Sequence, residues 1–139
     1  MNGAVARDLL LALQGLVVTI LALHDWVPLG KFNRVRTIRA ERTLTQLFTV
    51  TAVQTLPFAF GLVCSAFYRY TPYPTWLYAW LWISYAAMFL GQVQAWWIPY
   101  IIRPLRAARA RDRVTPNTLH LLLHLATIAI VILLVFEPR

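Results

Sequence analysis

The sequence predicts an all-α protein, a polytopic membrane bundle of four transmembrane helices with both termini on the outer side. Two observations predict the helices: the 139 residues are 60% hydrophobic, and four long apolar stretches, each near the ~20 residues that a helix needs to cross a bilayer core, fill most of the chain. The third observation, the placement of basic residues, predicts the orientation. Little chain remains for a soluble core, so we expect a single transmembrane domain over residues 1–139.

The four expected helices have approximate ranges of 8–29, 44–68, 76–102 and 117–136. Arg7 precedes the first apolar run, as it would in a signal peptide. No small-x-small cleavage site follows, and the run continues through Trp26, so we interpret it as a membrane helix.

Local signals at the helix ends and interiors support these ranges. Thr43 and Gln46 have the spacing of a capping box at the start of the second helix. Pro57 lies near the centre of that helix, where it removes a backbone donor and predicts a kink or a bound hydroxyl. Thr115 and Pro116 match the N-cap and first position of the fourth helix.

Basic residues are concentrated in two of the three loops. The loop before the second helix carries Lys31, Arg34, Arg36, Arg39 and Arg42, and the loop before the fourth carries Arg103, Arg106, Arg109, Arg111 and Arg113. Only Arg7, Arg69 and Arg139 lie elsewhere. Since short basic loops stay in the cytoplasm, this distribution predicts a multi-pass protein of the cell inner (plasma) membrane with both termini outside.

The net charge of +8 has two possible explanations, nucleic acid or the membrane surface. The basic loops are short, adjoin helix ends and lack a recognition fold, so we expect no nucleic-acid partner. We expect contact with anionic lipid headgroups at the cytoplasmic face instead. The residues expected to make it are Arg34, Arg36, Arg39, Arg106, Arg109 and Arg111.

Polar residues at membrane depth are the candidate functional residues, because such groups are costly in hydrocarbon and usually face the bundle interior. His24 and Asp25 end the first helix, and His120 and His124 lie four residues apart near the start of the fourth. These four are the candidate ligand or metal-binding residues. Residues expected to orient them are Gln46, Gln92 and Asn117.

Several functions remain open for this cluster. His120 and His124 have a spacing that permits metal ligation, with His24 or Asp25 completing the set, and histidines from two helices are also haem ligands. A histidine beside Asp25 also fits a proton-coupled or small-molecule transporter, which at this size would work as an oligomer. An enzyme acting on lipid headgroups lacks a convincing nucleophile, so the sequence favours a protein without catalytic activity.

The interpretation that we favour from sequence is a structural or accessory subunit of a membrane assembly, in which the polar residues fix helix register through interhelical hydrogen bonds. Ala87, Gly91 and Ala95 provide small residues at four-residue spacing, which permits close helix approach within the bundle or to a partner subunit. The expected partners are the lipid bilayer, a second copy of the chain or a larger membrane complex.

Three segments also carry a resemblance. At His-Asp-Trp-Val-Pro-Leu-Gly (24–30), Ala-Trp-Trp-Ile-Pro-Tyr (95–100) and Thr-Pro-Asn-Thr-Leu-His (115–120), the chain resembles uncharacterised small bacterial four-helix integral membrane proteins. The resemblance spans most of the chain. It implies the fold, and it implies no activity.

Overall fold

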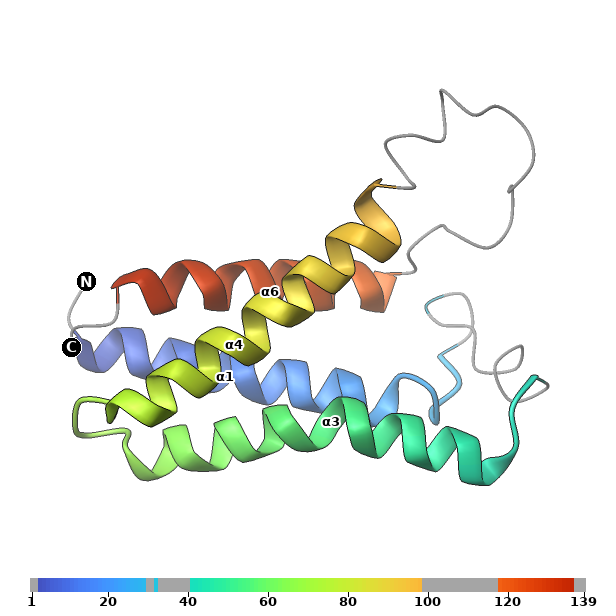
Figure 1. The fold of residues 1–139 in the computed structure, drawn as a ribbon, viewed down its shortest axis with the longest axis horizontal. Coiled ribbons are helices and arrows are strands. Elements are labelled where there is room, and N and C mark those ends of the chain that lie inside the picture. The colour runs from blue at the N-terminus through green and yellow to red at the C-terminus, as the bar shows by residue number, and fades with distance from the viewer. Residues whose placement is uncertain (1–2, 30–31, 33–40, 99–117, 137–139) are drawn as a thin grey trace.

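The computed structural model describes residues 3–29, 32, 41–98 and 118–136, and these form an all-α bundle (Figure 1). The described part of the chain contains four long α-helices and one short π-helix, and it contains no strand. The α-helices are α1 (Gly3–Leu23), α3 (Leu44–Phe67), α4 (Thr75–Gln92) and α6 (Thr118–Phe136), and the π-helix is η2 (Val93–Trp97), which continues α4.

Three of these helices, α1, α3 and α6, are long and apolar enough to cross a membrane. The α-helical part of α4 has only 18 residues. It contains two tyrosines and three tryptophans and ends at Gln92. The prediction of an all-α fold is confirmed for the described residues, and three of the four predicted membrane helices are long and apolar enough to cross a membrane.

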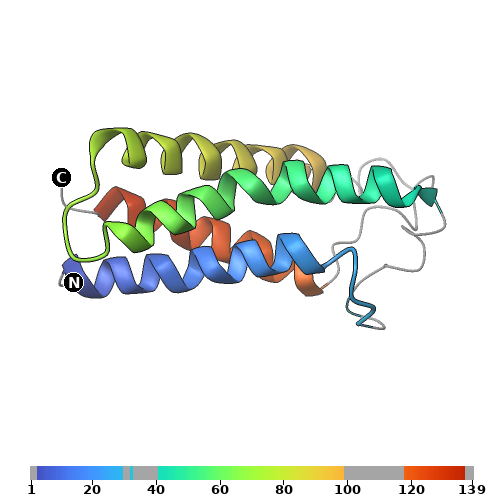
Figure 2. The ribbon, with the colours of Figure 1, turned by 90° about the horizontal axis from the view of Figure 1, so that it is seen from below.

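The helices pack in the order α1, α3, α4 and α6 around the bundle, since each of these contacts the next and α6 contacts α1. We call one end of the bundle the turn end: α1 begins there, the turn over residues 68–74 joins α3 to α4 there, and α6 finishes there (Figures 1 and 2). At the opposite end, the loop end, α1 and η2 finish and α3 and α6 begin.

The apolar core is built mainly by α1, α4 and α6. Its most deeply buried side chains are Leu10, Val17, Leu77, Leu81, Tyr85, Ile130 and Leu134. The helix α3 contributes little to this core, because its buried residues are only Leu47, Gly61 and Ser65. Most of the α3 surface is therefore available to lipid or to another protein.

The first helix is shifted toward the N-terminus relative to the prediction, because α1 begins at Gly3 rather than at residue 8 and ends at Leu23 rather than at Leu29. The amides of Trp26 and Val27 both bond the Leu23 carbonyl in a closing turn. Pro28 favours an end before Val27, since the residue before a proline is disfavoured in the helical region, and it has no N–H to bond the His24 carbonyl. His24 and Asp25 consequently lie on a turn just beyond the helix.

The other helix ends are closer to the prediction. The capping box is confirmed: the Thr43 amide donates to Gln46 Oε1 at 3.0 Å, and the Gln46 amide donates to Thr43 Oγ1 at 3.2 Å. The third helix changes to π geometry at Val93, where the Ile98 amide bonds the Val93 carbonyl. Residues 99–102, Thr115, Pro116 and Asn117 lie outside the described residues.

Candidate functional site

The His24–Asp25 pair lies at the loop end of the bundle. His24 Nε2 lies 3.2 Å from Asp25 Oδ1, and the two side chains are only 12% and 7% exposed. The other ring nitrogen, Nδ1, lies 3.0 Å from the Ile20 carbonyl oxygen and 3.3 Å from that of Leu21. The last turn of α1 thus supplies the carbonyls that fix the ring, and the turn after it supplies the carboxylate.

The contacts of His24 account for both polar atoms of its ring. The carbonyls of α1 lie beside Nδ1, and the Asp25 carboxylate lies beside Nε2.

The two histidines of α6 have different neighbours. The His120 ring lies 5.6 Å from the His24 ring in an edge arrangement, so the expected meeting of the first and fourth helices occurs at this end. The His124 ring, which is 1% exposed, lies 5.8 Å from the Trp97 ring of η2. His120 therefore belongs to the His24–Asp25 cluster, whereas His124 packs between α6 and the π-helix.

The expected orienting residues do not gather at one place. Gln46 is exposed, and its side chain caps α3. Gln92 is buried and donates from Nε2 to Thr127 Oγ1 at 3.1 Å, linking α4 to α6. Asn117 and the six arginines expected to contact lipid lie outside the described residues.

Within the described part of the chain, no three His, Cys, Asp or Glu side chains are grouped so that they could hold a metal ion. Cys64 is a free, half-buried thiol on α3. The described contacts of His24, Asp25 and His120 thus define a cluster of titratable side chains at the loop end.

Several interhelical polar contacts were not predicted from sequence. Gln14 Nε2 donates to Ser65 Oγ, and the Ser65 hydroxyl lies 3.2 Å from Gln14 Oε1, so the two fully buried side chains form a closed pair between α1 and α3. The Trp26 indole donates to Thr51 Oγ1 at 3.0 Å. The sequence shows Gln14 and Ser65 only as polar residues within apolar helices, which does not identify their partners.

One face of α4 changes its surroundings along its length. At the turn end Trp80 lies on this face, and its indole donates to the Pro57 carbonyl of α3 at 3.1 Å. Ala87, Gly91 and Gln94 follow Trp80 by 7, 11 and 14 residues, so helical periodicity places them on the same face. All three are exposed, and Figure 1 shows why: α4 runs obliquely and diverges from α3 toward the loop end.

The corresponding part of α3 is exposed as well. Gly61 of α3 packs against Trp80 and Leu81. Gln54 lies two helical turns before Gly61 on α3, yet the Gln54 side chain is exposed. Neither Gln54 nor Gln94 has a side-chain hydrogen bond within the described residues. We name Gln54, Ala87, Gly91 and Gln94 the α3–α4 open face.

The fold and these contacts define a class of protein: a small all-α bundle with helices long and apolar enough to cross a membrane, polar pairs between its helices and a His–Asp cluster at one end. Comparison with protein-family models, with curated proteins and with solved structures finds no match to this chain.

Proposed function

We propose that this protein is a structural or accessory subunit of a membrane assembly, and that the α3–α4 open face receives a helix of its partner. In this proposal the chain crosses the plasma membrane four times, with both termini and the 68–74 turn outside and the two basic loops in the cytoplasm. The loop end is then the cytoplasmic end.

The fourth crossing is supported by the continuity of α4 and η2. Together they carry the helix from Thr75 to Trp97, roughly 34 Å at about 1.5 Å per residue. That length is enough for a ~30 Å hydrocarbon core. The orientation rests on the basic loops, both of which join helices at the loop end.

The observation that carries the proposal is the exposure of two amides on helices that, in this proposal, cross the membrane. Gln54 lies near the middle of α3, and Gln94 lies on η2. An amide exposed to lipid leaves its hydrogen-bonding groups unsatisfied, which is costly, and a partner helix that supplies donors and acceptors removes this cost. Beside them, Ala87 and Gly91 permit close backbone approach, and a Cβ at Gly91 would meet no atom within 4 Å.

Photo-crosslinking in native membranes tests the proposal. A photoreactive amino acid at Ala87 is expected to crosslink to another polypeptide, and the same group at Val135, an exposed residue of α6, is expected to crosslink far less. Adducts with a different protein would identify the assembly, and adducts with a second copy would identify a homo-oligomer. Lipid adducts alone at both positions would overturn the proposal.

A matched pair of glycine substitutions gives a second test. Gly91→Ile fills the open face and is expected to reduce co-purification of the partner. Gly15→Ile adds the same side chain on α1, where a Cβ also meets nothing within 4 Å, and is expected to leave co-purification unchanged. Equal effects of the two substitutions would contradict a docking role for the open face.

Proton-coupled transport is the second candidate, and the geometry of His24 and Asp25 favours it. The Asp25 carboxylate and the His120 ring of α6 are among the groups that face the His24 ring. If this pair carries a proton in a transport cycle, Asp25→Asn is expected to abolish a pH-dependent flux in proteoliposomes while the protein stays folded. Asp8→Asn at the turn end is the matched control, and flux lost equally in both variants would count against this candidate.

A further inference from the structure

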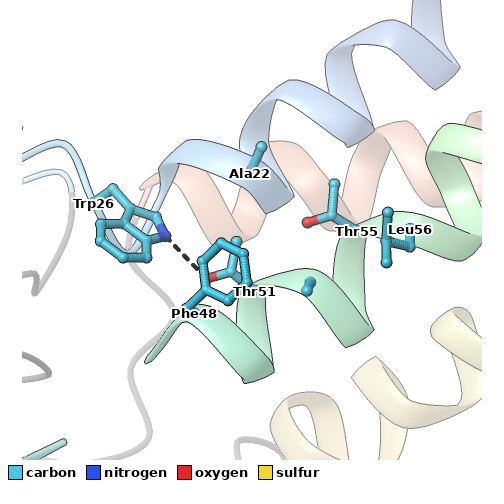
Figure 3. A pocket seen from close by; sticks show the side chains of 7 residues that line it. Ala22, Trp26, Phe48, Thr51, Thr55 and Leu56 are labelled. Atoms are coloured by element: carbon cyan, nitrogen blue, oxygen red, sulfur yellow. Dashed lines mark hydrogen bonds between the residues drawn. The ribbon is translucent and has the colours of Figure 1, made fainter. Parts of the chain in front are cut away.

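A groove separates α1 from α3 at the loop end, on surface distinct from the α3–α4 open face. Its volume is about 500 Å³, and Ala22 of α1 and Ala52 of α3 contribute to its walls (Figure 3). The small size of these two residues leaves room between the helices. Phe48 and Leu56, which are 67% and 65% exposed, also line it, so the groove opens to the surroundings of the bundle.

The lining of the groove is almost entirely apolar. Two threonines interrupt it: the Thr51 hydroxyl already accepts the hydrogen bond of the Trp26 indole, and the Thr55 hydroxyl is buried with no hydrogen-bond partner in the described part of the chain. The dashed contact in Figure 3 shows this bond at the end of the groove nearest the loop. A polar ligand would therefore find few partners in the groove, whereas a hydrocarbon chain needs none.

The sequence next to the groove is rich in basic residues. The segment that links its two walls, residues 30–42, contains five basic residues and one acidic residue, Glu41. Within the described residues, Arg42 is exposed one residue before the N-cap of α3, and Phe48 of the groove follows it by less than two turns. An arginine that can meet an anionic headgroup thus lies close along the chain to the start of the apolar groove.

We propose that the α1–α3 groove binds one acyl chain of an anionic phospholipid, whose phosphate is held near Arg42. The inference rests on the membrane insertion and orientation proposed above, and it is independent of the partner at the α3–α4 open face. Since an acyl chain is no more apolar than the surrounding bilayer, the selectivity of the site comes from its shape and from the headgroup charge rather than from the hydrophobic effect.

Native mass spectrometry tests this site directly. The full-length protein is purified in mild detergent and exposed to equal amounts of phosphatidylglycerol and phosphatidylcholine. The wild-type protein is expected to retain phosphatidylglycerol in preference to phosphatidylcholine. Arg42→Gln is expected to lower this retention about fivefold, the change that corresponds to one basic residue near an anionic surface, while Arg69→Gln at the opposite end leaves it unchanged.

Groove-filling variants test the position of the acyl chain. Ala52→Phe is expected to abolish retention of phosphatidylglycerol, and Val63→Phe, which adds similar bulk at a 55% exposed position of α3, is expected to preserve it. Ala22→Phe fills the groove from the opposite wall. If Ala52→Phe does not fold, retention of phosphatidylglycerol by Ala22→Phe gives the same test.

Two results would overturn the inference: retention that is equal in the groove-filled variants and the control, or binding of phosphatidylcholine as strong as that of phosphatidylglycerol. Loss of self-association in Ala52→Phe with lipid binding unchanged would instead assign the groove to a second copy of the chain. Crosslinking at Ala87 reports on the partner site alone, so failure of one proposal is distinguishable from failure of the other.

Discussion

The turn end and the loop end of this bundle both contain polar side chains, but the two ends differ in how these side chains are hydrogen-bonded within the chain. At the turn end, Gln14 and Ser65 satisfy each other, and the Tyr78 hydroxyl donates to the Leu134 carbonyl at 2.9 Å. Toward the loop end, two amides are exposed on the α3–α4 open face, and Gln92 Oε1 is buried without a hydrogen-bond partner in the described part of the chain.

The difference follows from the path of α4. Where α4 contacts α3, Gly61 allows the helices to approach closely, and the polar groups between neighbouring helices can be paired within the chain. Where α4 diverges, the same faces have no neighbour among the described elements. The turn end is therefore the part where α3 and α4 stabilise each other, and the loop end is the part where our proposals place the partner and the lipid.

The sharpest test of this comparison places one substitution at each end. A Cβ on Gly61 would lie 3.0 Å from Leu81 Cδ2 and 3.6 Å from Trp80 Cδ1. Gly61→Val is expected to lower the free energy of unfolding by about 1–3 kcal/mol, as overpacking does. Gly91→Val at the loop end is expected to have little effect on the isolated protein. Unfolding in mixed detergent micelles measures both, and equal losses would break the comparison.

The Gln14–Ser65 pair is expected to give the next largest effect. Ser65→Ala leaves a buried amide without its partner and should lower the free energy of unfolding by about 1 kcal/mol, since interhelical hydrogen bonds in membranes have modest values. The double variant Gln14→Leu with Ser65→Ala removes both polar groups and should recover part of the loss. A double-mutant cycle measures the coupling, and strictly additive losses would show that the pair does not stabilise the bundle.

A smaller effect of opposite sign is expected in the middle of α4. The Tyr85 hydroxyl is buried and has no hydrogen-bond partner within the described residues, while its ring packs edge-on against Phe58 at 5.1 Å. Tyr85→Phe keeps the ring contact and removes an unsatisfied polar atom, so stability should stay unchanged or rise by less than about 1 kcal/mol. A fall in the thermal unfolding temperature would reveal a partner for this hydroxyl.

The smallest effect is expected at the exposed ion pair of the turn end. Arg69 Nε donates to Asp8 Oδ1 at 2.7 Å, and this hydrogen bond, with the carboxylate charge, raises the pKa of Arg69 above its ordinary value. A raised pKa contributes stability that is present below the unfolded-state pKa and is lost only in strongly alkaline solution. Arg69→Gln should therefore lower the unfolding temperature slightly at pH 6 and pH 8 alike.

Salt provides the control for the ion pair. Because both side chains are well exposed, with 44% and 52% of their surface accessible, added salt should screen their attraction. The difference between the wild-type protein and Arg69→Gln is expected to shrink at high ionic strength. A difference that persists would assign Arg69 a packing role in place of an electrostatic one.

The sequence by itself determined the elements. Apolar length predicted the helices, Thr43 and Gln46 predicted the start of α3, and the positions of His24 and His120 predicted a polar cluster at one end. These features depend on residues close together in the chain, so local sequence specifies them. Pro28 was also in the sequence, and more weight on the residue that precedes a proline would have placed the end of α1 earlier.

Only the tertiary structure decided which helix covers which face. Helices that are apolar on every side carry no strong amphipathic pattern, so periodicity does not tell the interior from the lipid side. The pairing of Gln14 with Ser65, the separation of His120 from His124 and the exposure of Gln54 all depend on the packing order and on the oblique path of α4. Those are properties of contacts between distant segments, which local sequence does not specify.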